Sequence, residues 1–497
     1  MKHIKKILTL PALALAMGSL AGCGSKFSGV TINFWHTFGK TVTDALTSYA
    51  NTFAKLVKEH DGVDIRVKLT YKGGYTDVKN EVTKALSIAG NPTLTVAYPD
   101  HVADYFSVEK KPGDYVVNLE QFAEDPDIGF GKEDWLGDNH GSEDFIESFY
   151  QEGYGYQREG LYSLPFLKST EVMLYNQDLV LSAMSKIGIT PDGEDAPTTP
   201  DELREYLSDI SWEDFMDLCE SFKDHSKEIS KDLKWPAFYD SDGNLFISQL
   251  YQNDIPYADF DAQGNAYIGF NGMDETKATP EQIQAYEDVQ ALMKKYYNWH
   301  KKGLFETKGV DGQYSSNYLV PGKTMFAIGS CGGSGYSFPS SGEFKVGCVK
   351  VPYSNNNPLY VSQGPTLTIL NNKKLSAENN DIAVKYAFKF AKYITNDKIN
   401  ATLCTNNSEG YIPVRSSAYD HKVFTDYMAS STDYVIVTKC VLEEVAGQYL
   451  NSPVFKGSAT LRELVGGALA DILKKGSSDA AIKEIIDSAI EQAVLKM

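Results

Sequence analysis

Several short stretches of this sequence contain residue types used in catalysis, but none has the full spacing that its motif requires. Gly322-Lys323-Thr324 matches the end of a phosphate-binding loop, yet the upstream position that must be glycine is Asn317. Asp240-Ser241-Asp242-Gly243-Asn244 resembles a calcium-binding loop, but Tyr251 stands where the bidentate glutamate belongs. We therefore expect neither an ATP site nor a calcium site at these positions.

Acidic pairs such as Glu143 and Asp144 have the chemistry of the acid and base of a glycoside hydrolase. The chain has 66 acidic residues, so a solvated surface pair is the simpler interpretation of each. Ser334 lies among glycines, but Tyr336 breaks the G-x-S-x-G pattern of a nucleophile elbow. No nucleophile and base stand at a recognisable spacing.

Arginine is scarce, and this makes each one a candidate for anion binding. A guanidinium group is the side chain best shaped to hold phosphate in a bidentate manner. The chain has only five arginines among its 47 basic residues: Arg66, Arg158, Arg204, Arg415 and Arg462.

Cysteine and histidine usage argues against a metal site or a disulfide framework. After Cys23 the chain has five widely scattered cysteines without a C-x-x-C pair, and its eight histidines are scattered too. We expect buried thiols, no metal and no cofactor. These cysteines are Cys219, Cys331, Cys348, Cys404 and Cys440.

Length and charge narrow the class of protein. A chain of 497 residues, 42% of them hydrophobic, is long enough for two domains. The formal net charge of −19 argues against nucleic acid as a partner, although it leaves room for one small basic pocket.

The first residues have the form of an export signal. Lysines at positions 2, 5 and 6 precede an apolar run over 7–17, which is too short to span a membrane. Leu20-Ala21-Gly22-Cys23 is typical of a bacterial lipobox. We expect a signal peptide over 1–22, lipidation of Cys23, and a protein anchored only by lipid to the outer face of the bacterial cell membrane.

The elements that must position a site begin with an α/β pattern. Residues 31–35, 63–69 and 94–98 have strand character, and apolar residues recur at helical spacing over 41–59 and 78–89. Strands alternating with helices predict parallel pairing with helical crossovers.

The remaining chain alternates between helical and extended patterns. Residues 111–160 have few clear periods and predict loops, whereas 163–175 are extended and bridge to a second lobe. Further strands are expected over 323–330 and 345–351, and helices over 212–222, 280–299, 381–395 and 461–495.

Several motifs resemble, in order, those of family 1 extracellular solute-binding proteins, the receptors of ABC importers for sugars and related solutes. They are the lipobox, Phe34-Trp35-His36, Tyr71-Lys72-Gly73-Gly74-Tyr75, Gly90-Asn91-Pro92, Pro165-Phe166 with Leu174-Tyr175-Asn176, and Gly410-Tyr411-Ile412-Pro413-Val414. Within the family the chain is most similar to glycerol-3-phosphate-binding receptors, and also resembles maltose-type sugar receptors.

The resemblance implies an α/β, two-lobe periplasmic-binding-protein fold of type II, hinged by crossing strands. It implies an N-terminal lobe of residues 27–165 plus 331–364 and a C-terminal lobe of 166–330 plus 365–497. We place the crossings near Pro165, Ser330 and Gly364. The implied protein is a monomer that closes over a small solute, docks on ABC permease subunits and is not an enzyme.

The resemblance also implies ligand-binding residues, carried across one position at a time. An acidic residue that holds glycerol hydroxyls in the receptors falls at Pro99 here, and Asp100 is the nearest substitute. Arg462 matches the phosphate-pairing arginine, and Gly364 matches a backbone N–H contact. The full expected set is Tyr75, Asp100, Ser169, Trp212, Ser330, Gly364, Tyr411 and Arg462.

Two ligand classes stay open at this point. Serine, tyrosine, backbone N–H and arginine would hold a glycerophosphate, while aromatic rings, Asp100 and Asn176 would equally serve a sugar. A secreted glycosidase is the alternative from another class. A surface adhesin would show repeats, and none is visible.

Overall fold

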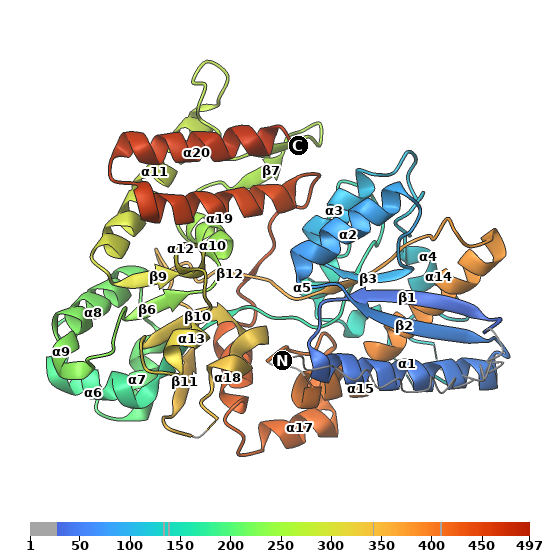
Figure 1. The fold of residues 1–497 in the computed structure, drawn as a ribbon, viewed down its shortest axis with the longest axis horizontal. Helices are drawn as coiled ribbons and strands as arrows, with labels where there is room; N and C mark the ends of the chain where they lie inside the picture. The colour runs from blue at the N-terminus through green and yellow to red at the C-terminus, as the bar shows by residue number, and fades with distance from the viewer. Residues whose placement is uncertain (1–26, 133–134, 138–139, 341, 408–409) are drawn as a thin grey trace, which may run out of the picture.

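A computed structural model describes residues 27–132, 135–137, 140–340, 342–407 and 410–497. Two α/β lobes, each built on a five-stranded sheet, stand side by side (Figure 1). The expected signal peptide and the lipidation residue Cys23 lie outside the described residues.

The first sheet has the order β2-β1-β3-β13-β4. Strand β1 pairs in parallel with both β2 and β3, as the alternating sequence pattern predicts. Strand β13 lies between β3 and β4 and runs antiparallel to both. The five strands are β1 (Val30–His36), β2 (Ile65–Tyr71), β3 (Leu94–Ala97), β4 (Leu164–Pro165) and β13 (Thr366–Ile369).

The second sheet has the order β11-β5-β10-β6-β9. Strand β5 runs antiparallel to its neighbours β10 and β11, whereas β10, β6 and β9 are parallel. The strands are β5 (Glu171–Asn176), β6 (Ala237–Tyr239), β9 (Phe305–Thr307), β10 (Phe326–Ser330) and β11 (Val346–Val349). Two small pairs complete the strands, β7 (Ala258–Phe260) with β8 (Ala266–Ile268) and β12 (Tyr360–Val361) with β14 (Tyr449–Leu450).

The chain passes between the sheets at two of the three expected places. It leaves the first sheet after Pro165, and returns to it through β12 and Gly364. It does not cross at Ser330, because β10 ends there and the next strand, β11, still belongs to the second sheet. A third passage lies near the C-terminus, where α17 (Lys422–Met428) packs on α15 (Asp397–Thr402) but α18 (Val435–Cys440) packs on β11.

This topology corrects two expected lobe assignments. Strand β11, inside the segment 331–364 expected in the N-terminal lobe, belongs to the second sheet. Strand β13, inside the segment 365–497 expected in the C-terminal lobe, belongs to the first sheet. Strand pairing is a contact between distant segments, so the order of apolar runs along the chain does not reveal it.

Helices cover the outer faces of both sheets (Figure 1). Helix α1 buries one stripe, with Val42, Leu46, Ala50, Phe53 and Val57 facing the first core. Around the first sheet lie α1 (Lys40–His60), α2 (Tyr75–Ser87), α3 (Pro99–Phe106), α4 (Glu120–Ala123), α5 (Glu147–Gln151) and α14 (Ala377–Ile394).

The second lobe carries most of the remaining helices. Thr279 caps α11, and Pro280 occupies its first turn, so this helix begins where the sequence predicts. The helices are α6 (Gln177–Ile187), α7 (Pro200–Ser208), α8 (Trp212–Asp224), α9 (Ser226–Ile229), α10 (Asp242–Gln252), α11 (Pro280–Lys301), α12 (Lys308–Asp311), α13 (Ser316–Leu319), α19 (Ser458–Lys475) and α20 (Asp479–Val494). Helix α16 (Ser416–Asp420) packs beside α15 and α17.

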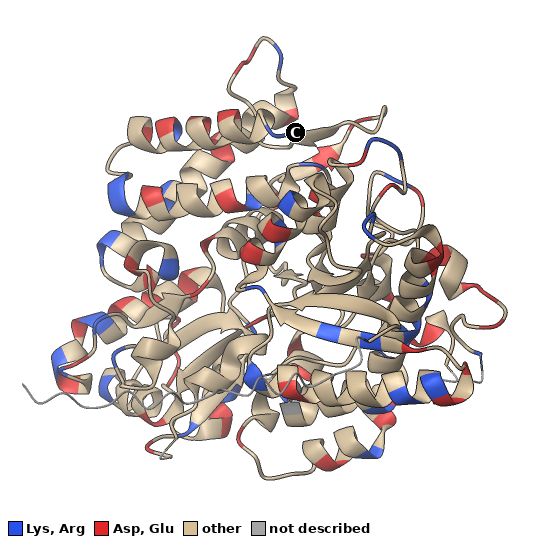
Figure 2. Cartoon of the chain, turned by 45° about the vertical axis from the view of Figure 1, so that its right-hand side comes forward, with Lys and Arg blue, Asp and Glu red and all other residues tan. Residues whose placement is uncertain are grey.

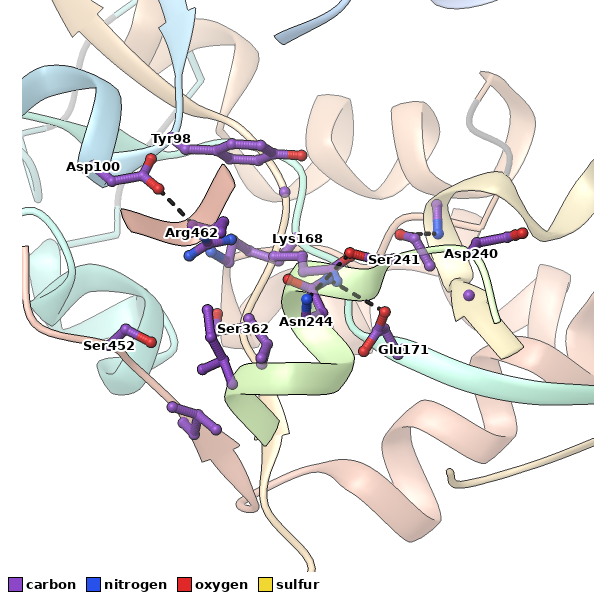
Figure 3. A pocket seen from close by; sticks show the side chains of 18 of the residues that line it. Tyr98, Asp100, Lys168, Glu171, Asp240, Ser241, Asn244, Ser362, Ser452 and Arg462 are labelled. Carbon is purple, nitrogen blue, oxygen red and sulfur yellow. Dashed lines mark hydrogen bonds and ion pairs between the residues drawn. The ribbon is translucent and has the colours of Figure 1, made fainter. Parts of the chain in front are cut away.

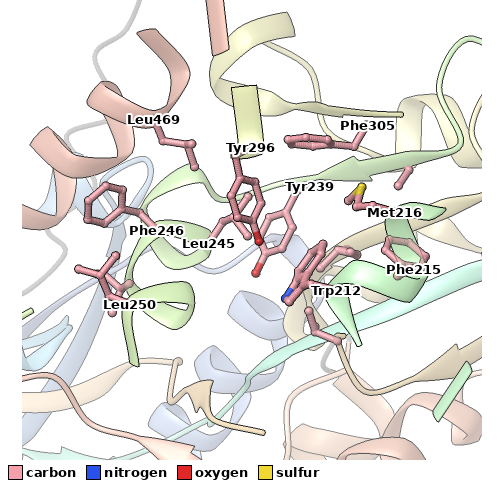
Figure 4. Close-up of a cluster of buried hydrophobic side chains, with 14 of the residues drawn as sticks. Trp212, Phe215, Met216, Tyr239, Leu245, Phe246, Leu250, Tyr296, Phe305 and Leu469 are labelled. Carbon is pink, nitrogen blue, oxygen red and sulfur yellow. The ribbon is translucent and has the colours of Figure 1, made fainter. Parts of the chain in front are cut away.

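The core of the second lobe is strongly aromatic (Figure 4). Trp212 stacks on Tyr239 at 6.2 Å between ring centroids, and meets the edges of Phe215 and Tyr296. All five cysteines after Cys23 are buried, as expected, and none of them is in a disulfide within the described residues. Acidic and basic side chains are interspersed over the outer helices (Figure 2).

Candidate functional site

A cavity of about 1050 Å³ lies between the two lobes. Its walls come from the start of α3 in the first lobe, from the segments that cross between the lobes, and from β10, α10 and α19 in the second lobe. Both lobes therefore contribute to one site (Figure 3).

The first-lobe wall begins where β3 ends. Tyr98 lines the cavity, and its ring stacks on Tyr75 with 4.3 Å between centroids. Pro99 starts α3, which places Asp100 in the first turn of that helix, facing the cavity. This wall thus presents an aromatic face beside a carboxylate.

An ion pair joins this wall to the second lobe. Arg462 Nε lies 3.3 Å from Asp100 Oδ2 (Figure 3). The Asp100 side chain is only 7% exposed. Burial lowers the pKa of Arg462, but Asp100 together with the neighbouring Tyr257, Tyr98 and Glu171 outweighs this and raises the pKa. The guanidinium therefore stays charged and is already paired.

A second, deeply buried ion pair joins a crossing segment to the first lobe. Lys168 Nζ donates to both carboxylate oxygens of Glu152, at 2.9 and 2.7 Å. Ser362 Oγ, on the returning segment, donates to Glu152 Oε1 at 2.6 Å. All three residues line the cavity, and Glu152 of the first lobe is thus bonded to both passages by charged hydrogen bonds.

Carboxyl groups dominate the second-lobe wall. Glu171 accepts hydrogen bonds from Tyr239 Oη at 2.6 Å and Asn244 Nδ2 at 3.2 Å. Burial raises the pKa of Glu171 to about 7. Asp240 accepts from the N–H and hydroxyl of Ser315, and burial raises its pKa to about 6. These acids are hydrogen-bonded by neutral donors and not by cations.

The charges around the cavity are unequal. Its described lining contains the carboxyl groups of Asp100, Glu152, Glu171, Asp240 and Asp259, against the cations Lys168, Lys308 and Arg462. Two of the cations are consumed by ion pairs, and Lys308 lies over the ring of Tyr314 at 3.7 Å. The described lining of the cavity therefore has more carboxyl groups than cations.

Four of the eight expected site residues line the cavity: Asp100, Ser330, Gly364 and Arg462. Gly364 is required there, because its φ of +97° is left-handed and a Cβ would lie 2.1 Å from Leu167 O. Ser330 accepts from the N–H of Gly332 and so shapes the turn below β10.

Three expected residues stand just behind the lining. Tyr75 supports Tyr98 from the first-lobe side. Ser169 is buried in the crossing, where its backbone pairs with Gln363. Tyr411 packs beside Gly332, so closely that a Cβ there would meet its ring at 2.8 Å.

The placement of Trp212 in the cleft is wrong. Its side chain is 2% exposed and lies in the aromatic core of the second lobe. Ser211 caps α8 and turns its first residue toward β6, where Tyr239 receives the indole ring. A large aromatic residue at the start of a helix can line a cleft or pack in a core. Here the contacts with neighbouring aromatic rings place it in the core.

Sequence reasoning missed five prominent lining residues: Tyr98, Lys168, Glu171, Asp240 and Asn244. Two of them had a signal, because Lys168 and Glu171 interrupt the otherwise apolar segment 164–175, and a charge in a buried strand needs a reason. Asp240 and Asn244 sat inside the discarded calcium-loop resemblance. Within the described ranges no cluster of His, Cys, Asp or Glu is arranged to hold a metal.

Comparison with protein families matches residues 49–432 to the bacterial extracellular solute-binding protein model. The chain belongs to this family. Family membership favours solute binding over catalysis and places the protein outside the cytoplasm, where such receptors serve ABC importers. No helix in the described parts of the chain is long and apolar enough to cross a membrane.

Solved structures share the two-lobe fold. The GacH receptor of Streptomyces glaucescens is 15% identical, with a TM-score of 0.61 over 93% of this chain and 98% of that one. UgpB from Mycobacterium tuberculosis, in complex with glycerophosphocholine, is 17% identical with a TM-score of 0.61 over 93% and 98%. Maltose-bound MalE3 of T. maritima is 12% identical with a TM-score of 0.61 over 94% and 100%. No curated protein matches the chain in sequence.

Proposed function

We propose that this protein is a lipid-anchored receptor that binds a neutral oligosaccharide and delivers it to an ABC importer. The observation that carries the ligand class is the cavity lining, in which five carboxyl groups face three cations, two of them already paired. Carboxylates accept hydrogen bonds from sugar hydroxyls, and amides both accept and donate them. A neutral sugar is not repelled by the charge of the carboxylates. A phosphate would meet a net negative wall.

The size and surface of the cavity support an oligosaccharide. Ligand sites for drug-sized molecules are roughly 300–1,000 Å³, and the cavity of about 1050 Å³ is slightly larger than that range. Tyr98, Tyr257 and Tyr314 contribute rings to its lining. Such rings present apolar faces suited to the C–H faces of sugars.

The proposed mechanism is closure of the lobes about the crossing segments. Ligand that touches both walls binds the closed arrangement better than an open one, and by linkage it stabilises that arrangement. Export and anchoring are proposed from Leu20-Ala21-Gly22-Cys23, with ABC permease subunits as partners and a monomeric receptor.

Thermal unfolding against a panel of sugars and glycerophosphates tests the ligand class. A ligand at 100 times its Kd adds roughly 2.7 kcal/mol of stability, which raises the melting temperature measurably. We expect shifts with maltose-type oligosaccharides and none with glycerol 3-phosphate. Shifts with glycerophosphates alone would refute the proposal.

A second candidate is hydrolysis of a bound glycoside. Glu171 and Asp240 both line the cavity with raised pKa values, and a glycosidase requires two carboxyl groups across the scissile bond. Incubation of each bound sugar with the protein, followed by chromatography, decides between them. Unchanged sugar is expected from a receptor, and cleavage products would establish the enzyme.

A further inference from the structure

The guanidinium of Arg462 and the carboxylate of Asp100 approach each other from opposite lobes. Arg462 projects from the first turns of α19, and Asp100 from the first turn of α3. Helices α19 and α3 are in contact, and Lys79 Nζ with Glu463 Oε1 at 3.2 Å bridges the same boundary. The pair is thus part of a wider contact between the two lobes and does not rest on one side chain alone.

Arg462 is the one arginine among the described residues that line the cavity. Its side chain is 30% exposed, so the guanidinium reaches the open space while Asp100, 7% exposed, lies behind it. Phosphate recognition by arginine needs free N–H groups and an uncompensated charge. Here the charge is compensated by Asp100 at 3.3 Å.

Within the described part of the chain, the second carboxylate oxygen of Asp100, Oδ1, lacks the cationic partner that Oδ2 has in Arg462. Oδ1 is buried and accepts no hydrogen bond from the described residues, although His101 Nε2 lies 3.7 Å away. Burial lowers the pKa of His101 to about 4, so this imidazole is neutral and does not cancel the carboxylate charge. Within the pair, the carboxylate charge therefore offsets that of Arg462, and it opposes the negative charge of any phosphate that approaches the guanidinium.

We propose that Asp100 is the residue that sets the charge selectivity of the cavity, by neutralising Arg462 and excluding phosphorylated solutes. This inference rests on the proposed carbohydrate function and adds the residue responsible for it. Specificity of this kind depends on a group that repels the wrong ligand, which here is the carboxylate of Asp100. Because Arg462 is paired with this carboxylate, it no longer offers an uncompensated charge to phosphate. Removing the charge of Asp100 should turn the site toward anions.

Asp100→Asn is the direct test, because asparagine keeps the shape and one acceptor oxygen but loses the charge. Titration calorimetry with sn-glycerol 3-phosphate should give the wild-type protein a Kd weaker than about 1 mM and the variant a Kd roughly 10- to 100-fold tighter. A variant that binds no more tightly than the wild-type protein overturns the proposal. Circular dichroism checks folding, and Asp100→Ser removes the same charge if the asparagine variant does not fold.

Two matched variants separate this effect from general electrostatics. Asp104 lies one turn along α3 and accepts from the N–H of Gly457 at 3.2 Å, without an ion pair to Arg462. Asp104→Asn should leave phosphate affinity unchanged, and an equal gain would overturn the proposal. Adding Arg462→Gln to Asp100→Asn should abolish the gain, because the freed guanidinium is the phosphate partner. If the gain in phosphate affinity persists in the double variant, Lys308 is its source, and the proposed role of the Asp100–Arg462 pair is refuted.

The test of Asp100 and the test of sugar binding can fail independently of each other. If no sugar binds the wild-type protein, the carbohydrate function fails, while the comparison of phosphate affinities still decides the role of Asp100. If sugars bind but Asp100→Asn gains no phosphate affinity, the function stands and the selectivity inference falls.

Discussion

The buried pair of Lys168 and Glu152 should be far more important to stability than an exposed pair of the same geometry. Lys168→Met removes the cation and leaves Glu152, whose side chain is 6% exposed, without its charged partner. Breaking a buried ion pair in this manner costs about 3–5 kcal/mol, because the remaining charge keeps its desolvation penalty and loses the compensating attraction. Ser362 would remain as a hydrogen-bond donor to Glu152, but it supplies no charge.

The chain contains its own control for this prediction. Lys302 contacts Glu220 at 2.8 and 2.6 Å, nearly the distances of the buried pair, but these side chains are 53% and 40% exposed. Lys302→Met should therefore cost less than about 1 kcal/mol, since water solvates the glutamate that is left behind. Burial is the main variable that differs between the two experiments.

Urea unfolding followed by intrinsic fluorescence measures both variants. We expect a difference of at least about 2 kcal/mol between them, and recovery of most of the loss in Lys168→Met/Glu152→Gln, where no buried charge is left. Equal effects of Lys168→Met and Lys302→Met would refute the reasoning. So would a double variant as unstable as the single one, because the cost would then lie in packing and not in charge.

Three further outcomes follow from single residues. Trp212→Ala should lower the free energy of unfolding in urea by about 3–5 kcal/mol, because aromatic packing is lost. The Kd for ligand, measured by calorimetry, should stay nearly unchanged. A large loss of affinity in a fully folded variant would show that Trp212 belongs to the binding site. Gly364→Ala should weaken both stability and ligand affinity, because its Cβ would lie 2.1 Å from Leu167 O, and wild-type melting and affinity would contradict the close approach. The pKa of Glu171 is raised to about 7 by burial, so the folded protein holds a proton that the unfolded chain releases near pH 4.5, and this group makes the protein less stable as pH rises from about 4.5 to 7. Glu171→Gln should flatten that part of the profile in melting curves between pH 4 and 8, and an unchanged slope would assign the titration elsewhere.

Much of the local structure was predictable from the sequence because it depends on neighbours along the chain. The apolar spacing over 41–59 predicts α1, and Pro280 marks the first turn of α11. The tail was less accurate, since the helix expected over 461–495 is two helices separated near Gly476. Boundaries depend on capping contacts that a periodic pattern does not contain.

The sequence by itself determined the α/β elements, the acidic surface and the family, because these follow from composition, periodicity and ordered motifs. Only the tertiary structure decided that β11 and β13 exchange their expected lobes, since strand pairing joins distant segments. It likewise decided that Asp100 and Arg462, far apart in sequence, lie 3.3 Å apart. An arginine that is suited to phosphate by its type is thereby neutralised by its surroundings, and the charge of a site is a property of what packs together.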